Sequence, residues 1–203
     1  MTMIVGIVSP LVAVVAADAV TFDSRTGRNI HLSKLRPIAS ARTVITARGD
    51  VHLVRTLADA AEELRSFDEI AAAAPDIVER AYERLAPAAP ASPGWFSEGY
   101  EVYIVGRSDR TRSMHATVLI RDADGFSRHE IPPTNSFLAP WSRDALGEKP
   151  LGPLLEDEGL VAAARTQAAW LRGLDPAVQV GGDLVAARID ASRITIETIA
   201  KEI

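Results

Sequence analysis

Three side chains near the start of the chain could form a reactive group. Thr2 follows Met1, Asp18 ends an apolar stretch sixteen positions later, and Lys34 comes after sixteen more. A threonine hydroxyl is a weak nucleophile that needs a base, and a charged group beside it changes its acidity. A hydroxyl, a carboxylate and an ammonium, once brought together, could therefore support nucleophilic catalysis.

Lys34 stands out because lysine is rare in this chain. Three of the 22 basic residues are lysines, at positions 34, 149 and 201, and the others are arginines. Unlike an arginine guanidinium, a buried lysine ammonium readily loses its proton or tunes a neighbouring group. Taken singly, each residue has an ordinary alternative: many chains start Met-Thr, Asp18 could be a turn or cap residue, and Lys34 could be a solvated surface charge.

The apolar stretch that joins the first two of these residues predicts a hairpin. Residues 3–8 and 11–17 are apolar, as buried strands are, and Ser9-Pro10 between them is typical of a tight turn. A secretory signal is not expected, because no Lys or Arg precedes this stretch. Residues 3–17 are also too few to span a membrane as a helix. We therefore expect a cytoplasmic protein with no membrane partner.

Apolar residues recur at helical or alternating spacing along the rest of the chain. The expected helices cover 51–65, 67–85 and 158–172, and the expected strands cover 100–108, 114–122, 125–131 and a final hairpin that turns at Asp190-Ala191. Pro75 is expected to split or kink the second helix. Residues 132–157 contain five prolines and are expected to be irregular.

This order of elements fits a single α+β domain over residues 1–203. Two antiparallel sheets would pack face to face with helices on their outer faces, because every sheet must bury its apolar face. A length of 203 residues suits one domain with a sizeable core, and 47% apolar and 24% charged residues are ordinary for a globular protein.

Composition also argues against several functions. The net charge of −5 disfavours nonspecific nucleic-acid binding, which needs a basic surface. The chain has no cysteine, which excludes disulfides, thiolate metal sites and a cysteine nucleophile. The four histidines lack the spacing of metal ligands, so we expect neither a metal nor a cofactor; they are His31, His52, His115 and His129.

The first 50 residues resemble the proteasome β-subunit family and its bacterial heat-shock protease relative, which are N-terminal-nucleophile hydrolases. In that family an N-terminal Thr precedes a short apolar hairpin, an Asp in "A-x-D" and a Lys in "x-K-(I/V/L)". Here the chain reads TMIVGIVSPLVAVVAAD, then NIHLSKLRPI, then TVITARGDV, with no gap from Thr2 to Lys34. The resemblance implies the fold of that class, a four-layer αββα sandwich of two antiparallel sheets.

The resemblance also implies a catalytic role for each of the three residues. Thr2 would be the nucleophile and, through its free α-amine, the base, because such an amine has a pKa of about 7.7–8.0. Asp18 would keep Lys34 charged and oriented, and the ammonium would lower the pKa of the Thr2 amine and hydroxyl. Met1 must then be removed, since an acylated Thr2 nitrogen cannot act as a base.

An oxyanion site is implied at the end of the strand near residue 46. The backbone N–H groups of Ala47, Arg48 and Gly49 would stabilise the tetrahedral intermediate. The family has "G-x-G" in this turn, whereas this chain reads TARGD, so the Arg48 side chain could alter the pocket.

Two supporting positions depart from the family. The family's serine after the middle strands aligns with Pro140, and Ser136 and Ser142 are the candidate substitutes. Before the Gly181-Gly182 pair the family has an Asp and a Ser, whereas here Asp175 lies two residues early and Val180 stands next to the pair. The supporting candidates are thus uncertain while the primary three residues are kept.

The function expected from these residues is that of a threonine-type peptidase acting on peptides or unfolded proteins. The resemblance implies a homo-oligomeric ring that encloses the sites, with an ATP-dependent unfoldase as partner. The departures leave two alternatives open. One is a catalytically silent structural or assembly member of the same fold, and the other is a small-amide hydrolase.

Overall fold

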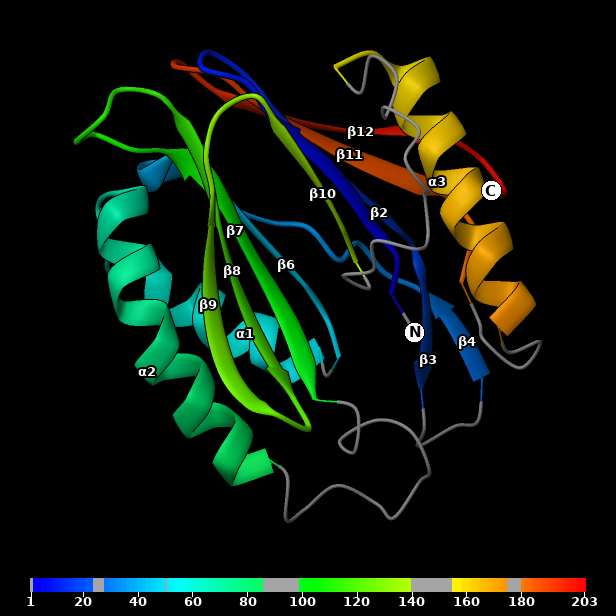
Figure 1. Cartoon of the computed structure of the whole chain (residues 1–203), viewed down its shortest axis with the longest axis horizontal. Helices are drawn as coiled ribbons and strands as arrows, with labels where there is room; N and C mark the ends of the chain where they lie inside the picture. The colour runs from blue at the N-terminus through cyan, green and yellow to red at the C-terminus, as the bar shows by residue number, and fades with distance from the viewer. Residues whose placement is uncertain (1, 24–27, 50, 86–98, 140–154, 175–179) are drawn as a thin grey trace.

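The computed structural model describes residues 2–23, 28–49, 51–85, 99–139, 155–174 and 180–203 (Figure 1). Their strands form two five-stranded antiparallel sheets and one two-stranded sheet, flanked by three α-helices. The described part of the chain is therefore a mixed α+β structure, as the order of sequence patterns predicts.

The first sheet contains both ends of the described chain. Its strands lie in the order β10 (Asn135–Ala139), β1 (Ile4–Val8), β2 (Ala13–Asp18), β11 (Leu184–Ile189) and β12 (Ile194–Ala200). β1 and β2 are buried along almost their whole length, because the helix α3 (Asp157–Leu174) covers one face and the second sheet covers the other. This two-sided burial explains their continuous apolar sequences.

The second sheet is covered by two helices on its outer face. Its strands lie in the order β5 (Arg36–Ile38), β6 (Thr43–Arg48), β7 (Tyr100–Arg107), β8 (Met114–Asp122) and β9 (Gly125–Ile131). A short 3₁₀ turn, η1 (Ala39–Ala41), joins β5 to β6. The helices α1 (Val51–Ala61) and α2 (Phe67–Leu85) pack their apolar faces on β6 and β7.

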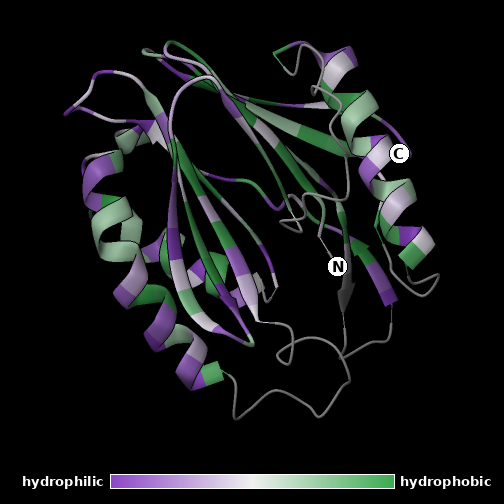
Figure 2. Cartoon of the chain, in the orientation of Figure 1, coloured by the Kyte–Doolittle hydropathy of each residue, from purple (hydrophilic) through white to green (hydrophobic). Residues whose placement is uncertain are grey.

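The layers follow from three groups of buried side chains. One lies between α1, α2 and the second sheet, one between the two sheets, and one between the first sheet and α3. Figure 1 shows this succession of helices, sheet, sheet and helix, and Figure 2 shows that the central strands are largely hydrophobic. The small sheet of β3 (Val20–Asp23) and β4 (Arg28–His31) extends from the end of β2.

The predicted N-terminal hairpin is confirmed. Ser9 closes the turn between β1 and β2: its N–H donates to the Val12 carbonyl at 2.9 Å, and its hydroxyl donates to the same carbonyl at 2.7 Å. Leu11 lies at this turn and is 77% exposed, and Pro10 beside it is exposed as well, which accounts for the break in an otherwise buried stretch. The final hairpin at Asp190 is confirmed as well.

Two expectations about local structure were wrong. Residues 135–139 form β10 rather than irregular structure, because they pair antiparallel with β1 and bury Phe137 between the sheets. The prolines that suggested an irregular segment lie outside this strand. Pro75 also does not split α2, which runs as one helix from Phe67 to Leu85.

No helix in the described ranges is long and apolar enough to cross a membrane.

Candidate active site

The side chains of Asp18 and Lys34 form a buried ion pair. Lys34 Nζ lies 2.8 Å from Asp18 Oδ1, and the two side chains are 6% and 0% exposed. Sequence analysis paired these residues, and the fold brings them into contact from the end of β2 and from the segment that follows β4.

The backbone around Asp18 holds its carboxylate in a fixed place. Asp18 is the last residue of β2, between β1 and the chain that enters β11. Its Oδ1 also accepts a hydrogen bond from the Met3 N–H at 2.8 Å, and its Oδ2 accepts one from the Gly181 N–H at 3.2 Å. Both oxygens are thus engaged, as a buried carboxylate requires.

Burial changes the acidity of Lys34. Removal from water lowers the pKa of the Lys34 ammonium below its ordinary value of 10.5, while the charge of Asp18 and its hydrogen bond offset part of this lowering. A buried lysine with a lowered pKa gives up its proton more readily than a surface lysine does. Burial therefore lowers the pKa of Lys34 by more than the charge and the hydrogen bond of Asp18 raise it.

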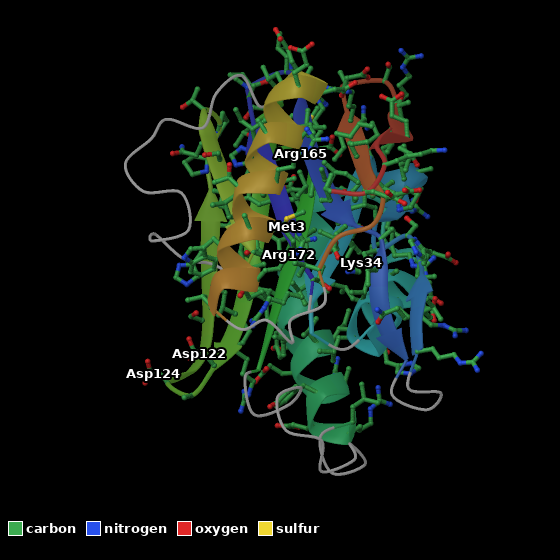
Figure 3. All side chains as sticks on the ribbon, turned by 90° about the vertical axis from the view of Figure 1, so that its right-hand side faces the viewer. Met3, Lys34, Asp122, Asp124, Arg165 and Arg172 are labelled. Carbon is green, nitrogen blue, oxygen red and sulfur yellow. The ribbon has the colours of Figure 1, made fainter. Side chains whose placement is uncertain are left out.

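Thr2 is connected to this pair through the next residue, Met3. Thr2 is 7% exposed, and it precedes Met3, whose N–H binds Asp18. Because the Met3 carbonyl also accepts from the Asp18 N–H at 3.3 Å, the main chain after Thr2 is fixed on both sides of Met3. Figure 3 shows Met3 and Lys34 in the same region of the molecule.

The predicted oxyanion residues lie at the end of β6. Ala47 pairs with Val102 in β7, and Gly49 follows the strand with a φ of 121°, in the region that favours glycine. β5 begins two residues after Lys34 and pairs with β6 so that Arg36 lies opposite Ile45. Extending this register backwards leads the chain at Lys34 toward the level of Ala47.

The Arg48 side chain lies among buried polar groups between the sheets. Its Nη1 lies 3.3 Å from Glu101 Oε1, and the two side chains are 15% and 7% exposed. The Tyr103 hydroxyl lies 2.7 Å from Glu101 Oε2 and 2.8 Å from the Leu138 carbonyl oxygen. Sequence analysis missed Glu101 and Tyr103, although an acid inside the apolar strand YEVYIVG was a signal that could have been used.

The structure describes one of the supporting candidates, Ser136, and does not place it at the site. Ser136 lies in β10 opposite Ile7, whereas Ala139 of the same strand lies opposite Ile4. Ser136 is therefore at the far end of β1 from Thr2, and the structure does not bring it to the site. Ser142, Asp175 and the departure at Pro140 lie outside the described residues.

Two groups that sequence analysis did not place at the site are contributed by the C-terminal part of the chain. The Gly181 N–H binds Asp18, and Arg172 on α3 donates to the Val180 carbonyl at 2.8 Å. The Gly pair suggested only a close approach of backbones, and nothing in the sequence pointed to Arg172. Figure 3 shows Arg172 in the same region as Met3 and Lys34.

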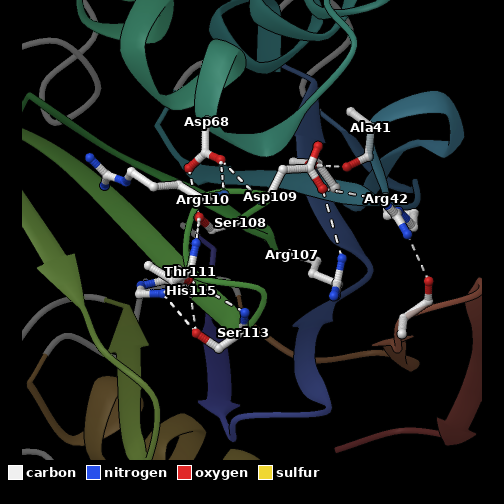
Figure 4. A network of polar contacts seen from close by, with 12 residues as sticks. Ala41, Arg42, Asp68, Arg107, Ser108, Asp109, Arg110, Thr111, Ser113 and His115 are labelled. Carbon is white, nitrogen blue, oxygen red and sulfur yellow. Dashed lines mark hydrogen bonds and ion pairs between the residues drawn. The ribbon is translucent and has the colours of Figure 1, made fainter.

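A second polar cluster lies at the other end of β7 (Figure 4). Asp68, near the start of α2, accepts from the Ser108 hydroxyl at 2.8 Å and from the Asp109 N–H at 2.9 Å. His115 Nε2 lies 2.7 Å from the Thr111 hydroxyl, and a cavity of about 610 Å³ borders this cluster. These contacts fasten the turn after β7 to α2, and we assign no chemistry to them.

Among the described residues, no group of three or more His, Asp or Glu side chains is arranged to hold a metal ion.

Comparison with known proteins adds no relative. No protein-family model matches the chain. No curated protein matches it significantly either.

Proposed function

We propose that this chain is an N-terminal-nucleophile hydrolase of the proteasome-like class, with the αββα sandwich of that class and the activity of a threonine-type peptidase. Thr2 is the nucleophile once removal of Met1 frees its amino group. Peptides or unfolded proteins are the substrates.

One observation carries this proposal. The carboxylate of Asp18, which is fully buried, joins the Lys34 ammonium to the Met3 N–H, the first backbone donor after Thr2. A buried ion pair costs several kcal/mol of desolvation per ion before attraction and hydrogen bonding offset it. A pair of this kind, bound to the backbone N–H that directly follows Thr2, supports a chemical role rather than a structural one.

The chemistry follows from the groups around Thr2. The Thr2 hydroxyl oxygen attacks the substrate carbonyl carbon while its proton passes to the α-amine of the same residue. The amine then gives this proton to the leaving nitrogen as the peptide bond breaks, and water hydrolyses the remaining ester. Lys34 favours the neutral amine and stabilises the negative charge that develops on the Thr2 oxygen.

Backbone N–H groups of the segment 47–49 are proposed to bind the carbonyl oxygen during attack. The positive φ of Gly49 supports this role, because a left-handed residue after a strand turns its N–H groups away from the ladder. The Arg48–Glu101 pair supports a substrate pocket that differs from one built around a glycine at position 48.

The proposal extends to assembly. Members of the class enclose their sites in rings, so we propose a homo-oligomeric ring that accepts substrate from an ATP-dependent unfoldase. Light scattering on the purified chain tests the ring, and a mass equal to one chain at micromolar concentration would contradict it.

The test of the nucleophile uses a covalent probe. Intact mass first establishes whether Met1 is lost, and the processed protein then reacts with a peptide epoxyketone. We expect one adduct at Thr2 by tandem mass spectrometry, an adduct in Thr2→Ser, and none in Thr2→Ala.

The role of Lys34 is tested with a matched lysine. Lys34→Met should slow adduct formation by about 100-fold, the low end of what the loss of one group that stabilises charge in the transition state costs. Lys201→Met, which changes an exposed lysine, should react at the original rate. If processed wild-type protein forms no adduct, the peptidase is ruled out and the silent assembly member becomes the better explanation.

A further inference from the structure

The peptide group between Val180 and Gly181 is held from both sides. Its carbonyl oxygen, on Val180, accepts a hydrogen bond from Arg172 Nη2 at 2.8 Å. Its N–H, on Gly181, donates to Asp18 Oδ2 at 3.2 Å. One peptide unit therefore connects a guanidinium on α3 to the carboxylate that binds Lys34.

We propose that Arg172 is a positioning residue of the candidate site. Its charge acts through the 180–181 peptide and supports the ionised carboxylate of Asp18, which holds Lys34. The catalytic consequence rests on the proposed function, whereas the connection from Arg172 to Lys34 does not.

The contacts around the Val180–Gly181 peptide suit an arginine at position 172 and a glycine at position 181. The same Arg172 nitrogen reaches the Ile203 main-chain oxygen at 3.0 Å, and the Ile203 N–H donates to the Gly182 carbonyl at 3.0 Å. A Cβ atom on Gly181 would lie 2.7 Å from Arg172 Nη2, and Gly181 has a φ of 129°. The positive φ, together with the Ile203 backbone oxygen that would lie 2.8 Å from an added Cβ atom, thus requires glycine at position 181.

The electrostatic effect has a defined direction. A cation at the carbonyl end of a peptide polarises it, so that the N–H at the other end becomes a stronger donor. A stronger donor takes up more of the negative charge of Asp18 and leaves less of it to stabilise the Lys34 ammonium. Arg172 is also a like charge to that ammonium. Both effects make Lys34 easier to deprotonate.

Few charged groups compete with this effect near Lys34. Asp18 is the one charged side chain in direct contact with the ammonium among the described residues, and Arg172 acts through the peptide. His31, at the end of β4, lies against Gly182.

The test measures Lys34 itself by NMR. With three lysines in the chain, protein labelled with ¹³C and ¹⁵N at lysine gives few side-chain signals. We expect the pKa of Lys34 to rise by about 0.5 in Arg172→Gln, which corresponds to the loss of a weak hydrogen bond. The amide proton of Gly181 should move upfield in the same variant, because its hydrogen bond weakens.

Two further variants separate charge from packing. Arg172→Lys keeps the cation and should return both signals most of the way to wild type. Arg165→Gln removes an exposed charge from the same helix and should change neither. No change in folded Arg172→Gln would overturn the proposal, and equal changes in Arg172→Lys and Arg172→Gln would show that the charge plays no part.

The epoxyketone reaction distinguishes this inference from the proposed function. If Thr2 reacts, the pH at which the rate is half-maximal should move upward in Arg172→Gln. If Thr2 never reacts while the NMR signals move as expected, the proposed function fails and the positioning of Asp18 by Arg172 stands.

Discussion

At the scale of the residue, Asp18 and Lys34 illustrate a balance between burial and charge. Asp18 is completely buried, and its two oxygens accept from Met3, Lys34 and Gly181. These hydrogen bonds offset the cost of burying the Asp18 carboxylate. For Lys34, burial lowers the pKa by more than the charge and the hydrogen bond of Asp18 raise it, so the pKa falls below its ordinary value. Buried ion pairs of this kind contribute little net stability.

The lowered pKa of Lys34 predicts how the stability of the protein depends on pH. Between the lowered value in the folded state and 10.5 in the unfolded state, the unfolded chain binds more protons. The free energy of unfolding therefore rises with pH across this interval, with a slope of at most about 1.4 kcal/mol per pH unit.

Urea unfolding of wild type and Lys34→Arg between pH 7.5 and pH 10 measures this slope as the difference between the two proteins. Arginine stays protonated throughout, so the Lys34 contribution disappears in the variant while the cation remains. A difference that is constant with pH would contradict a lowered pKa at Lys34. If Lys34→Arg does not fold, the double variant Asp18→Asn/Lys34→Met, which removes both charges, takes its place in the comparison with wild type.

At the scale of the element, β1 needs a small residue at one position of its antiparallel pairing with β10. Phe137 lies opposite Gly6, and a Cβ atom added at Gly6 would lie 2.2 Å from the Phe137 ring. The same ring stacks on Tyr103 with 5.2 Å between centroids. The glycine in IVGIV is thus explained by a neighbour 131 positions away in the sequence, which no local pattern reveals.

Gly6→Ala should lower the free energy of unfolding by about 1–3 kcal/mol, the usual cost of overpacking a core. Gly173→Ala is the matched control, because nothing lies within 4 Å of the added carbon in α3, and it should stabilise by about 0.5–1 kcal/mol. Denaturant unfolding of both variants gives the comparison. Equal changes in the free energy of unfolding at the two positions would show that Phe137 does not pack against Gly6.

At the scale of the whole molecule, polar groups join the two sheets across an apolar core. Tyr103 lies in the second sheet, and its hydroxyl is within 2.8 Å of the Leu138 carbonyl oxygen in the first. The same hydroxyl lies 2.7 Å from Glu101, and burial raises the pKa of Tyr103 well above its ordinary value. Burial therefore favours the neutral phenol, which is the form that can donate a hydrogen bond.

Tyr103→Phe should lower the free energy of unfolding by about 1–2 kcal/mol, because it removes the single hydroxyl proton that lies within hydrogen-bond reach of both Glu101 and the Leu138 carbonyl inside the core. Thermal unfolding measures the loss, and near-ultraviolet circular dichroism verifies that the packing of the aromatic rings is kept. An unchanged midpoint would mean that the hydroxyl does not link the sheets.

The sequence by itself determined the local structure and the identity of the central pair. Unbroken apolar runs predicted β1 and β2, helical spacing predicted α1, α2 and α3, and the family resemblance of the first 50 residues paired Asp18 with Lys34. These features depend on neighbours in the chain or on a short hairpin, so they leave a local pattern.

Only the tertiary structure decided what surrounds that pair. Residues 135–139 form the strand β10 because they pair with the edge of β1. The register of this pairing places Ser136 at the far end of β1 from Thr2, and so excludes Ser136 from the site. The Gly181 N–H reaches Asp18, more than 150 positions away in the sequence, and Arg172 on α3 reaches the Val180 carbonyl of the same peptide group, because the C-terminal part of the chain folds back onto β2. Hydrogen bonds over such separations depend on packing between layers, and the donor of Gly181 is a backbone group of a kind that every sequence contains.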